Sequence, residues 1–193
     1  PGSSSPPRFG RSNDNSAVKR HQLEHLLRAA GSITGCDEIY VIGSQAILAT
    51  IGTGPEELFL SREADVFVDQ RPDLSDLIDG SIGELSPFDH AFGYYAHGVG
   101  ADTATLPRGW RERLIRLENA NTGGTTGLCL EVHDLAASKL AAGREKDRDF
   151  LSALMQGALI DVNTLSERAE ALPIDEEQMG VIRGRLKRMI SRI

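Results

Sequence analysis

The sequence predicts an α/β (α+β) fold that ends in an all-helical C-terminal part. Short apolar segments typical of strands alternate with helical patterns in the earlier part of the chain, whereas the pattern after Asp134 is helical to the end. Breaks are expected at Gly143, near Gly157 and at Pro173, because glycine and proline end helices.

The chain has 193 residues, of which 40% are hydrophobic and 25% are charged, as in a globular protein that can bury a core. Residues 1–16 are rich in Ser, Pro and Gly and predict a disordered tail. We expect a core at 17–143 and a helical region at 144–193.

Hydrophobic spacing predicts the individual elements. Leu23, Leu26, Leu27 and Ala30 recur at helical spacing, and Gly31 is expected to end that helix. The other predicted elements are a strand at 38–42, a helix at 44–51, a turn at 53–55, a strand at 64–68, a helix after residue 72, a loop-rich stretch at 79–107 with a strand in 92–100, and strands in 113–118 and 127–132 joined by a glycine-rich turn.

The charge of the chain bears on whether the protein binds nucleic acid. A net charge of −7 argues against a surface coated in positive charge for nucleic-acid binding. A local basic surface is suggested by Arg108, Arg111, Arg113 and Arg116 around Trp110, although solvated faces explain these arginines more simply.

Several features predict a cytoplasmic protein without membrane association. Cys36 and Cys129 have no metal-type or redox spacing. No apolar run approaches the roughly 20 residues of a membrane-spanning helix, and the start of the chain lacks the layout of a secretory signal.

Two acids at alternate positions suggest a cation site. Glu63 and Asp65 are expected on the same face of a strand, because side chains alternate there. Adjacent like charges are costly unless they share a proton or bind a cation. Mg²⁺ suits such a pair, with Mn²⁺ as an alternative, because Mg²⁺ is held by one or two carboxylates together with substrate phosphates. Taken alone, such a pair is more often an exposed sheet face.

A Gly-Ser turn precedes this strand and suggests phosphate binding. Gly43 lets the backbone approach a ligand closely, and a following helix would offer free N–H groups with favourable dipole polarity. Ser44 can add a hydroxyl. The order of turn, helix and acidic strand therefore favours phosphate chemistry over either motif alone.

This order resembles the core signature of polymerase-beta-type nucleotidyltransferases. The downstream segment LEVHDLAASKLAAGREKDRDF resembles bacterial nucleotidyltransferase-like proteins related to abortive-infection toxins. The resemblance covers residues 39–154. It implies a mixed sheet flanked by helices, Mg²⁺-dependent transfer of a nucleotide from a nucleoside triphosphate such as ATP, and often a role beside a cognate toxin or antitoxin.

The resemblance also implies roles for particular residues. Glu63 and Asp65 would bind the metal and take part in catalysis. The family usually has Asp at the first position, and the longer Glu63 shifts the ion by about a bond length. The nucleotide-binding residues that the resemblance implies are Gly43, Ser44, Lys139, Arg144 and Lys146.

A third catalytic acid has two candidates. Glu131 alternates with Leu130 and Val132 in a predicted strand and can face the site, or it is a plain surface residue. Asp147 lies beside cationic residues expected near phosphate, or it caps a helix. Asp147 is the preferred candidate.

The segment His21 to His25 matches the inverted zinc-protease pattern H-x-x-E-H. Both histidines are expected to point away from the apolar stripe of their helix and into solvent, which disfavours zinc hydrolysis.

Two functions therefore compete. In the first, a hydroxyl on an RNA end, as in tRNA, or on a protein side chain attacks the α-phosphate, and pyrophosphate leaves. The alternative is a non-catalytic nucleotide- or protein-binding module on the same fold, which the Glu63 departure favours. The Gly-Ser turn, Asp65 and Lys139 favour the enzyme.

Overall fold

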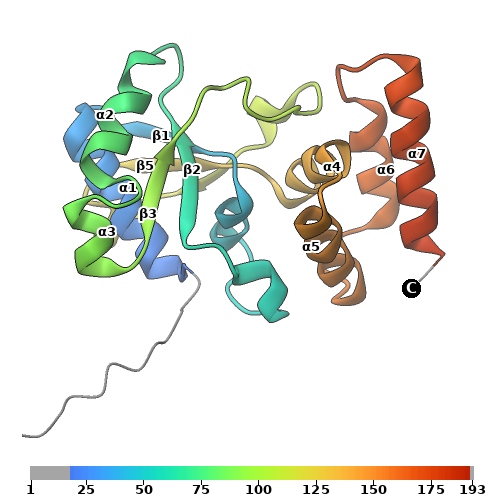
Figure 1. The fold of residues 1–193 in the computed structure, drawn as a ribbon, viewed down its shortest axis with the longest axis horizontal. Coiled ribbons are helices and arrows are strands. Elements are labelled where there is room, and N and C mark those ends of the chain that lie inside the picture. The colour runs from blue at the N-terminus through green and yellow to red at the C-terminus, as the bar shows by residue number, and fades with distance from the viewer. Residues whose placement is uncertain (1–17, 192–193) are drawn as a thin grey trace, which may run out of the picture.

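A mixed sheet forms the centre of the N-terminal part (Figure 1). The computed structural model describes residues 18–191, so the tail predicted at 1–16 lies outside the described residues. The five strands have the order β3-β2-β1-β5-β4. They are β1 (Glu38–Val41), β2 (Glu63–Phe67), β3 (Tyr95–Gly98), β4 (Ile115–Leu117) and β5 (Thr126–Cys129). β1 runs antiparallel to β2 and parallel to β5, β2 runs parallel to β3, and β4 runs antiparallel to β5. The predicted mixed sheet is confirmed.

One face of the sheet is covered by helices. These are α1 (Arg20–Thr34) and α2 (Asp73–Ile82), with α3 (Pro87–Phe92) beside them. Ile39 and Val41 of β1 and Ala64 and Val66 of β2 are buried in the hydrophobic core. Because side chains alternate along a strand, residues 63 and 65 project from the opposite face, away from α1 and α2.

The sequence analysis placed three local features wrongly. Gly31 does not end α1, which continues to Gly35, where a φ of 70° closes the helix. A Cβ atom on Gly31 would lie 2.1 Å from Thr125 Oγ1, so this glycine lets α1 approach the chain before β5. The segment after Gly43 is a 3-10 helix, η1 (Ser44–Ala49), and α3 was predicted as loop.

The C-terminal part is helical, as predicted (Figure 1). It comprises α4 (Val132–Ala142), α5 (Glu145–Gln156), α6 (Val162–Glu170) and α7 (Glu176–Ile190). Gly143 ends α4 with a φ of 63°. Arg185 of α7 donates hydrogen bonds to the carbonyls of Leu140 and Ala141, at 2.9 and 2.8 Å, and so fastens α7 to the end of α4. No helix between residues 18 and 191 is long and apolar enough to cross a membrane.

A buried ion pair joins the helical part to the sheet. The Asp134 carboxylate, 0% exposed, accepts two hydrogen bonds from Arg113, at 2.8 and 2.9 Å. Arg168 of α6 approaches the same carboxylate at 3.3 Å. Arg113 belongs to η3 (Trp110–Arg113), just before β4, so this carboxylate links three separate segments. These contacts keep α4 and α6 in place beside the sheet.

Candidate active site

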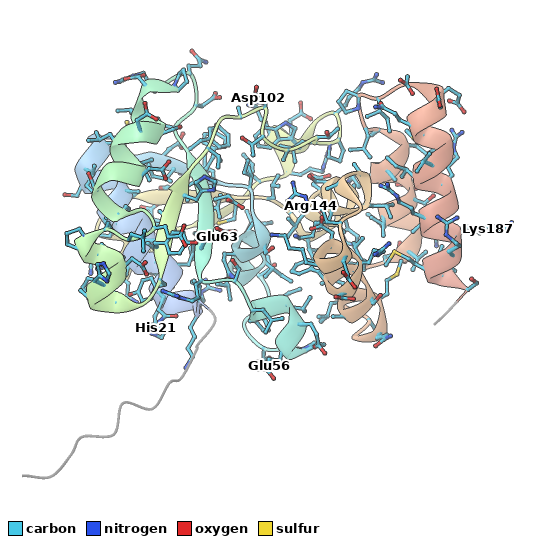
Figure 2. All side chains as sticks on the ribbon, viewed as in Figure 1. His21, Glu56, Glu63, Asp102, Arg144 and Lys187 are labelled. Atoms are coloured by element: carbon cyan, nitrogen blue, oxygen red, sulfur yellow. The ribbon has the colours of Figure 1, made fainter. Side chains whose placement is uncertain are left out.

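A cavity of about 1050 Å³ lies between the uncovered face of the sheet and the C-terminal helices. Figure 2 shows Glu63 on the sheet side and Arg144 on the helical side of this region. The residues predicted for the site that line the cavity are Gly43, Ser44, Glu63, Asp65, Lys139, Arg144, Lys146 and Asp147. The structure therefore gathers in one place residues as far apart in the sequence as Gly43 and Asp147.

Gly43 and Asp65 fit against each other. The backbone of Gly43, with φ of −82° and ψ of −172°, is open to any residue, so its conformation does not require glycine. The space around Gly43 does require glycine, because a Cβ atom at this position would lie 2.1 Å from Asp65 Oδ2. The Ile42 amide donates to the Asp65 carbonyl at 3.1 Å and fixes the two segments side by side. The Gly-Ser turn and the acidic strand are thus in direct contact and belong to the same site.

The ionised form of Asp65 is disfavoured in the folded protein. Burial raises the pKa of Asp65, and the nearby Glu63 carboxylate raises it further. His97 and Lys139 act in the opposite direction, and His97 Nδ1 lies 3.1 Å from Asp65 Oδ1. A cation between the two carboxylates would relieve both the repulsion and the loss of water.

Glu63 is held by a tyrosine. The Tyr95 hydroxyl donates to Glu63 Oε2 at 3.2 Å. Burial, and then the Glu63 charge, raise the pKa of Tyr95 to about 12. The hydroxyl therefore stays protonated at neutral pH and orients the carboxylate that it contacts.

A second charged pair faces the carboxylates from the helical side. Lys139 Nζ lies 3.1 Å from Asp147 Oδ1, and Asp147 Oδ2 accepts from the Arg144 amide at 3.3 Å. Burial lowers the pKa of Lys139, and the Asp147 charge opposes that shift. The Lys139 ammonium also lies over the Phe150 ring, 4.6 Å from its centroid. Arg144 and Lys146 are exposed at the start of α5 and line the same cavity.

Comparison with known families gives one match. Residues 21–180 match the model of a family described as nucleotidyltransferase of unknown function (DUF6036). The chain belongs to this nucleotidyltransferase family. The matched range includes both the acidic strand and the Lys139–Asp147 pair. No curated protein and no solved structure matches the chain.

Glu131 does not occupy the position that was predicted for it. β5 ends at Cys129, and Glu131 is the N-cap of α4, where its carboxylate accepts from the amides of His133 and Asp134. His133 Nδ1 contacts Glu131 Oε1 at 2.7 Å, and its Nε2 accepts from the Asp161 amide at 2.9 Å. Glu131 is not among the residues that line the cavity. Its environment indicates a helix-capping role.

His97 lines the cavity and contacts Asp65, but the sequence analysis did not identify it as a site residue. The parallel pairing of β2 with β3 places His97 directly opposite Asp65. The sequence predicted a strand around this histidine but gave no information about strand order or register. That pairing alone brings the ring to the carboxylate.

Of the two histidines in the zinc-protease pattern, His21 is exposed, as expected, whereas His25 is half-buried. His25 does not point into solvent: its Nδ1 lies 2.8 Å from the Tyr94 hydroxyl, and its ring packs against Phe88 and Phe92. Glu24, the acid of the pattern, accepts hydrogen bonds from Asn119 and Asn121. Within residues 18–191, no group of three or more His, Cys, Asp and Glu side chains converges as a zinc site would require. The contacts of His25 and Glu24 therefore give no support to zinc hydrolysis by the segment His21 to His25.

Proposed function

We propose that the protein is a Mg²⁺-dependent nucleotidyltransferase that moves a nucleotide from a nucleoside triphosphate to a hydroxyl acceptor. One observation carries the proposal: the Asp65 carboxylate lies in the space that the missing side chain of Gly43 leaves open. It lies there beside Glu63, in the cavity that Lys139 also lines.

The two carboxylates suit a magnesium ion. Glu63 and Asp65 would hold it, since Mg²⁺ is commonly bound by one or two carboxylates with the remaining positions taken by water and phosphate oxygens. When bound, the ion supplies positive charge that offsets the charge of the reacting phosphate. Burial, and then the Glu63 charge, raise the pKa of Asp65, and a bound cation would offset both effects.

The cationic residues suit the triphosphate. Lys139, Arg144 and Lys146 line the cavity and can pair with phosphate oxygens. The Ser44 hydroxyl lies on the same cavity wall and can donate to a phosphate oxygen. These residues would act by positioning and by charge neutralisation, the main contributions in phosphoryl transfer.

A second candidate function is a nucleotide-binding module that does not transfer. It is favoured because both candidates for the third catalytic acid are engaged elsewhere: Glu131 caps α4, and Asp147 pairs with Lys139 and the Arg144 amide. On β2 the next residue of the acidic face is Phe67, a buried ring stacked on Tyr40 at 4.7 Å. Such a module would bind a nucleotide or a partner protein, including a cognate toxin or antitoxin.

A labelling experiment separates the two functions. Each α-³²P-labelled nucleoside triphosphate is incubated with the protein, Mg²⁺ or Mn²⁺, total tRNA and cell extract. Transfer by the wild type that is lost in Asp65→Ala but kept in Asp76→Ala, an exposed acid on α2, supports the enzyme. Nucleotide binding without transfer supports the module. Equal transfer by wild type and Asp65→Ala would remove Asp65 from the mechanism.

A further inference from the structure

Strand β3 lies beside the acidic strand β2 at one edge of the sheet (Figure 1). Its register places Tyr95 directly opposite Glu63 and His97 directly opposite Asp65. Because side chains alternate along both strands, Tyr95 and His97 project from the same face of the sheet as the two acids. β3 therefore carries one polar side chain for each of the two carboxylates.

Each carboxylate accepts a hydrogen bond from its neighbour on β3. The Tyr95 hydroxyl lies 3.2 Å from Glu63 Oε2, and His97 Nδ1 lies 3.1 Å from Asp65 Oδ1. An ionised carboxylate can only accept, so His97 Nδ1 carries the proton of its contact. Among the described residues, no other group donates a hydrogen bond to either carboxylate. A carboxylate has about four acceptor positions, so these contacts orient the acids and leave room for an ion.

The length of each donor matches the acid that it holds. Glu63 is longer than Asp65 by a methylene group, and it is met by the long side chain of Tyr95. The shorter Asp65 is met by His97 at Oδ1, and its Oδ2 lies against Gly43. A glutamate has several rotatable bonds, and fixing them costs conformational entropy. The contact with Tyr95 removes part of that cost before an ion binds.

Strand β3 is itself held in place by α2. The Gly98 amide donates to Asp79 Oδ1 at 2.7 Å, and the Ser75 hydroxyl donates to the Val99 carbonyl at 2.9 Å. Gly98 packs so closely against α2 that a Cβ atom there would lie 2.2 Å from the Ser75 carbonyl oxygen. A donor on a fixed strand holds its acceptor more precisely than a donor on a loop.

We propose that Tyr95 and His97 are positioning residues that set the affinity of the site for a divalent cation, by holding Glu63 and Asp65 in the orientation that binds it. The inference rests on the metal-dependent function proposed above. Mg²⁺ requires near-ideal octahedral geometry, so a carboxylate that is free to rotate binds it less well. Side chains that hydrogen-bond to metal-binding groups commonly contribute about 10- to 100-fold to metal affinity.

Tyr95 acts only through Glu63. Among the described residues that line the cavity, His97 is present and Tyr95 is absent, so the tyrosine has no direct access to a substrate. Burial, and then the Glu63 charge, raise the pKa of Tyr95 to about 12, so its hydroxyl remains a donor throughout the neutral pH range.

The test measures the binding of Mn²⁺ alone to the full chain, from the electron paramagnetic resonance signal of the free ion. Tyr95→Phe removes only the hydroxyl that contacts Glu63, and the control Tyr94→Phe removes the neighbouring hydroxyl, which contacts His25 instead. We expect Tyr95→Phe to bind Mn²⁺ about tenfold more weakly than wild type, and Tyr94→Phe to bind it as wild type does. Equal affinities of the two phenylalanine variants would overturn the role of Tyr95.

Two substitutions of His97 separate its hydrogen bond from its ring. The amide of His97→Asn can donate from near the position of the histidine Nδ1, whereas His97→Phe keeps a ring and has no donor. We expect His97→Phe to bind Mn²⁺ about tenfold more weakly than wild type, and His97→Asn to recover most of that loss. Equal losses in the two variants would overturn the role of His97.

A double-mutant cycle tests whether Tyr95 acts through Glu63. In the Glu63→Ala background the tyrosine has no carboxylate to hold, so adding Tyr95→Phe should cause no further loss of Mn²⁺ affinity. A further loss of about tenfold in that background would contradict a positioning role.

Failure of the inference is distinguishable from failure of the proposed function. Wild type that binds Mn²⁺ and transfers label, while the Tyr95 and His97 variants match it in Mn²⁺ affinity, would overturn the inference alone. Wild type that binds no Mn²⁺, with or without a nucleoside triphosphate, would remove the metal from the proposed function, and the inference would fail with it.

Discussion

Gly43→Ala tests the central contact of the site with a single methyl group. The new Cβ would lie 2.1 Å from Asp65 Oδ2, and real Cβ atoms essentially never come closer than 3.0 Å to a neighbour. The Asp65 carboxylate must therefore move by about 1 Å. The backbone does not oppose the change, because φ at Gly43 is −82°.

The expected effect is large on activity and small on stability. A displacement of about 1 Å in a group that positions reactants can cost roughly 100-fold in rate. Losing the hydrogen bond between Asp65 and His97 costs about 0.5–1.5 kcal/mol, and replacing glycine by alanine at a permitted conformation returns about 0.4–1 kcal/mol. The free energy of unfolding should thus change by less than about 1 kcal/mol.

The assay combines label transfer with urea unfolding of wild type, Gly43→Ala and Gly80→Ala. Gly80 is an exposed residue of α2 where an added Cβ would meet nothing within 4 Å, so this control should keep full activity. Undiminished transfer by Gly43→Ala would refute the assignment of the site. A loss of transfer matched by a fall in unfolding free energy of several kcal/mol would instead show a folding defect.

Three further variants test whether particular carboxylates act in the site, in the buried ion pair or as a helix cap. The raised pKa of Asp65 means that the folded chain binds this proton more tightly than the unfolded chain, so ionised Asp65 destabilises the fold above that pKa. Asp65→Asn should therefore melt at a higher temperature than wild type at pH 8, by a margin that shrinks towards pH 4, while losing transfer; calorimetry showing a lower melting temperature contradicts this. Asp134→Ala leaves Arg113 and Arg168 without their buried partner and should cost about 3 kcal/mol in urea unfolding, and a loss below about 1 kcal/mol would mean that the pair is not structural. Glu131→Ala should cost about 1 kcal/mol as a lost helix cap and keep transfer within about twofold, whereas a far larger fall in transfer would restore Glu131 as a catalytic residue.

The helical C-terminal part shows how far local signals extend. Its breaks at Gly143, Gly157 and Pro173 agree with the helix boundaries, because a glycine or proline acts within one or two turns of its own position. Gly31 carried the same signal but lies inside α1, since its role is contact with Thr125 and not termination. The sequence does not distinguish these two uses of glycine.

Glu131 shows where local reasoning failed at the site. A run of apolar residues predicted that β5 would extend through it, but the strand ends at Cys129 and the helix begins at Val132. Strand ends are set by which residues find hydrogen-bonding partners on neighbouring strands, and these partners are distant in sequence. His97 could not be assigned to the site for the same reason, because its position depends on the register of β3 against β2.

By itself, the sequence determined that Glu63 and Asp65 share a strand face, that a Gly-Ser turn precedes them, and that cationic residues follow on helices. These properties depend on alternation and helical spacing, which act over a few residues. Only the tertiary structure decided that Asp65 lies against Gly43 and beside His97, and that Lys139 reaches the same cavity. Such contacts follow from strand order, register and helix packing, because these join segments that the chain keeps far apart.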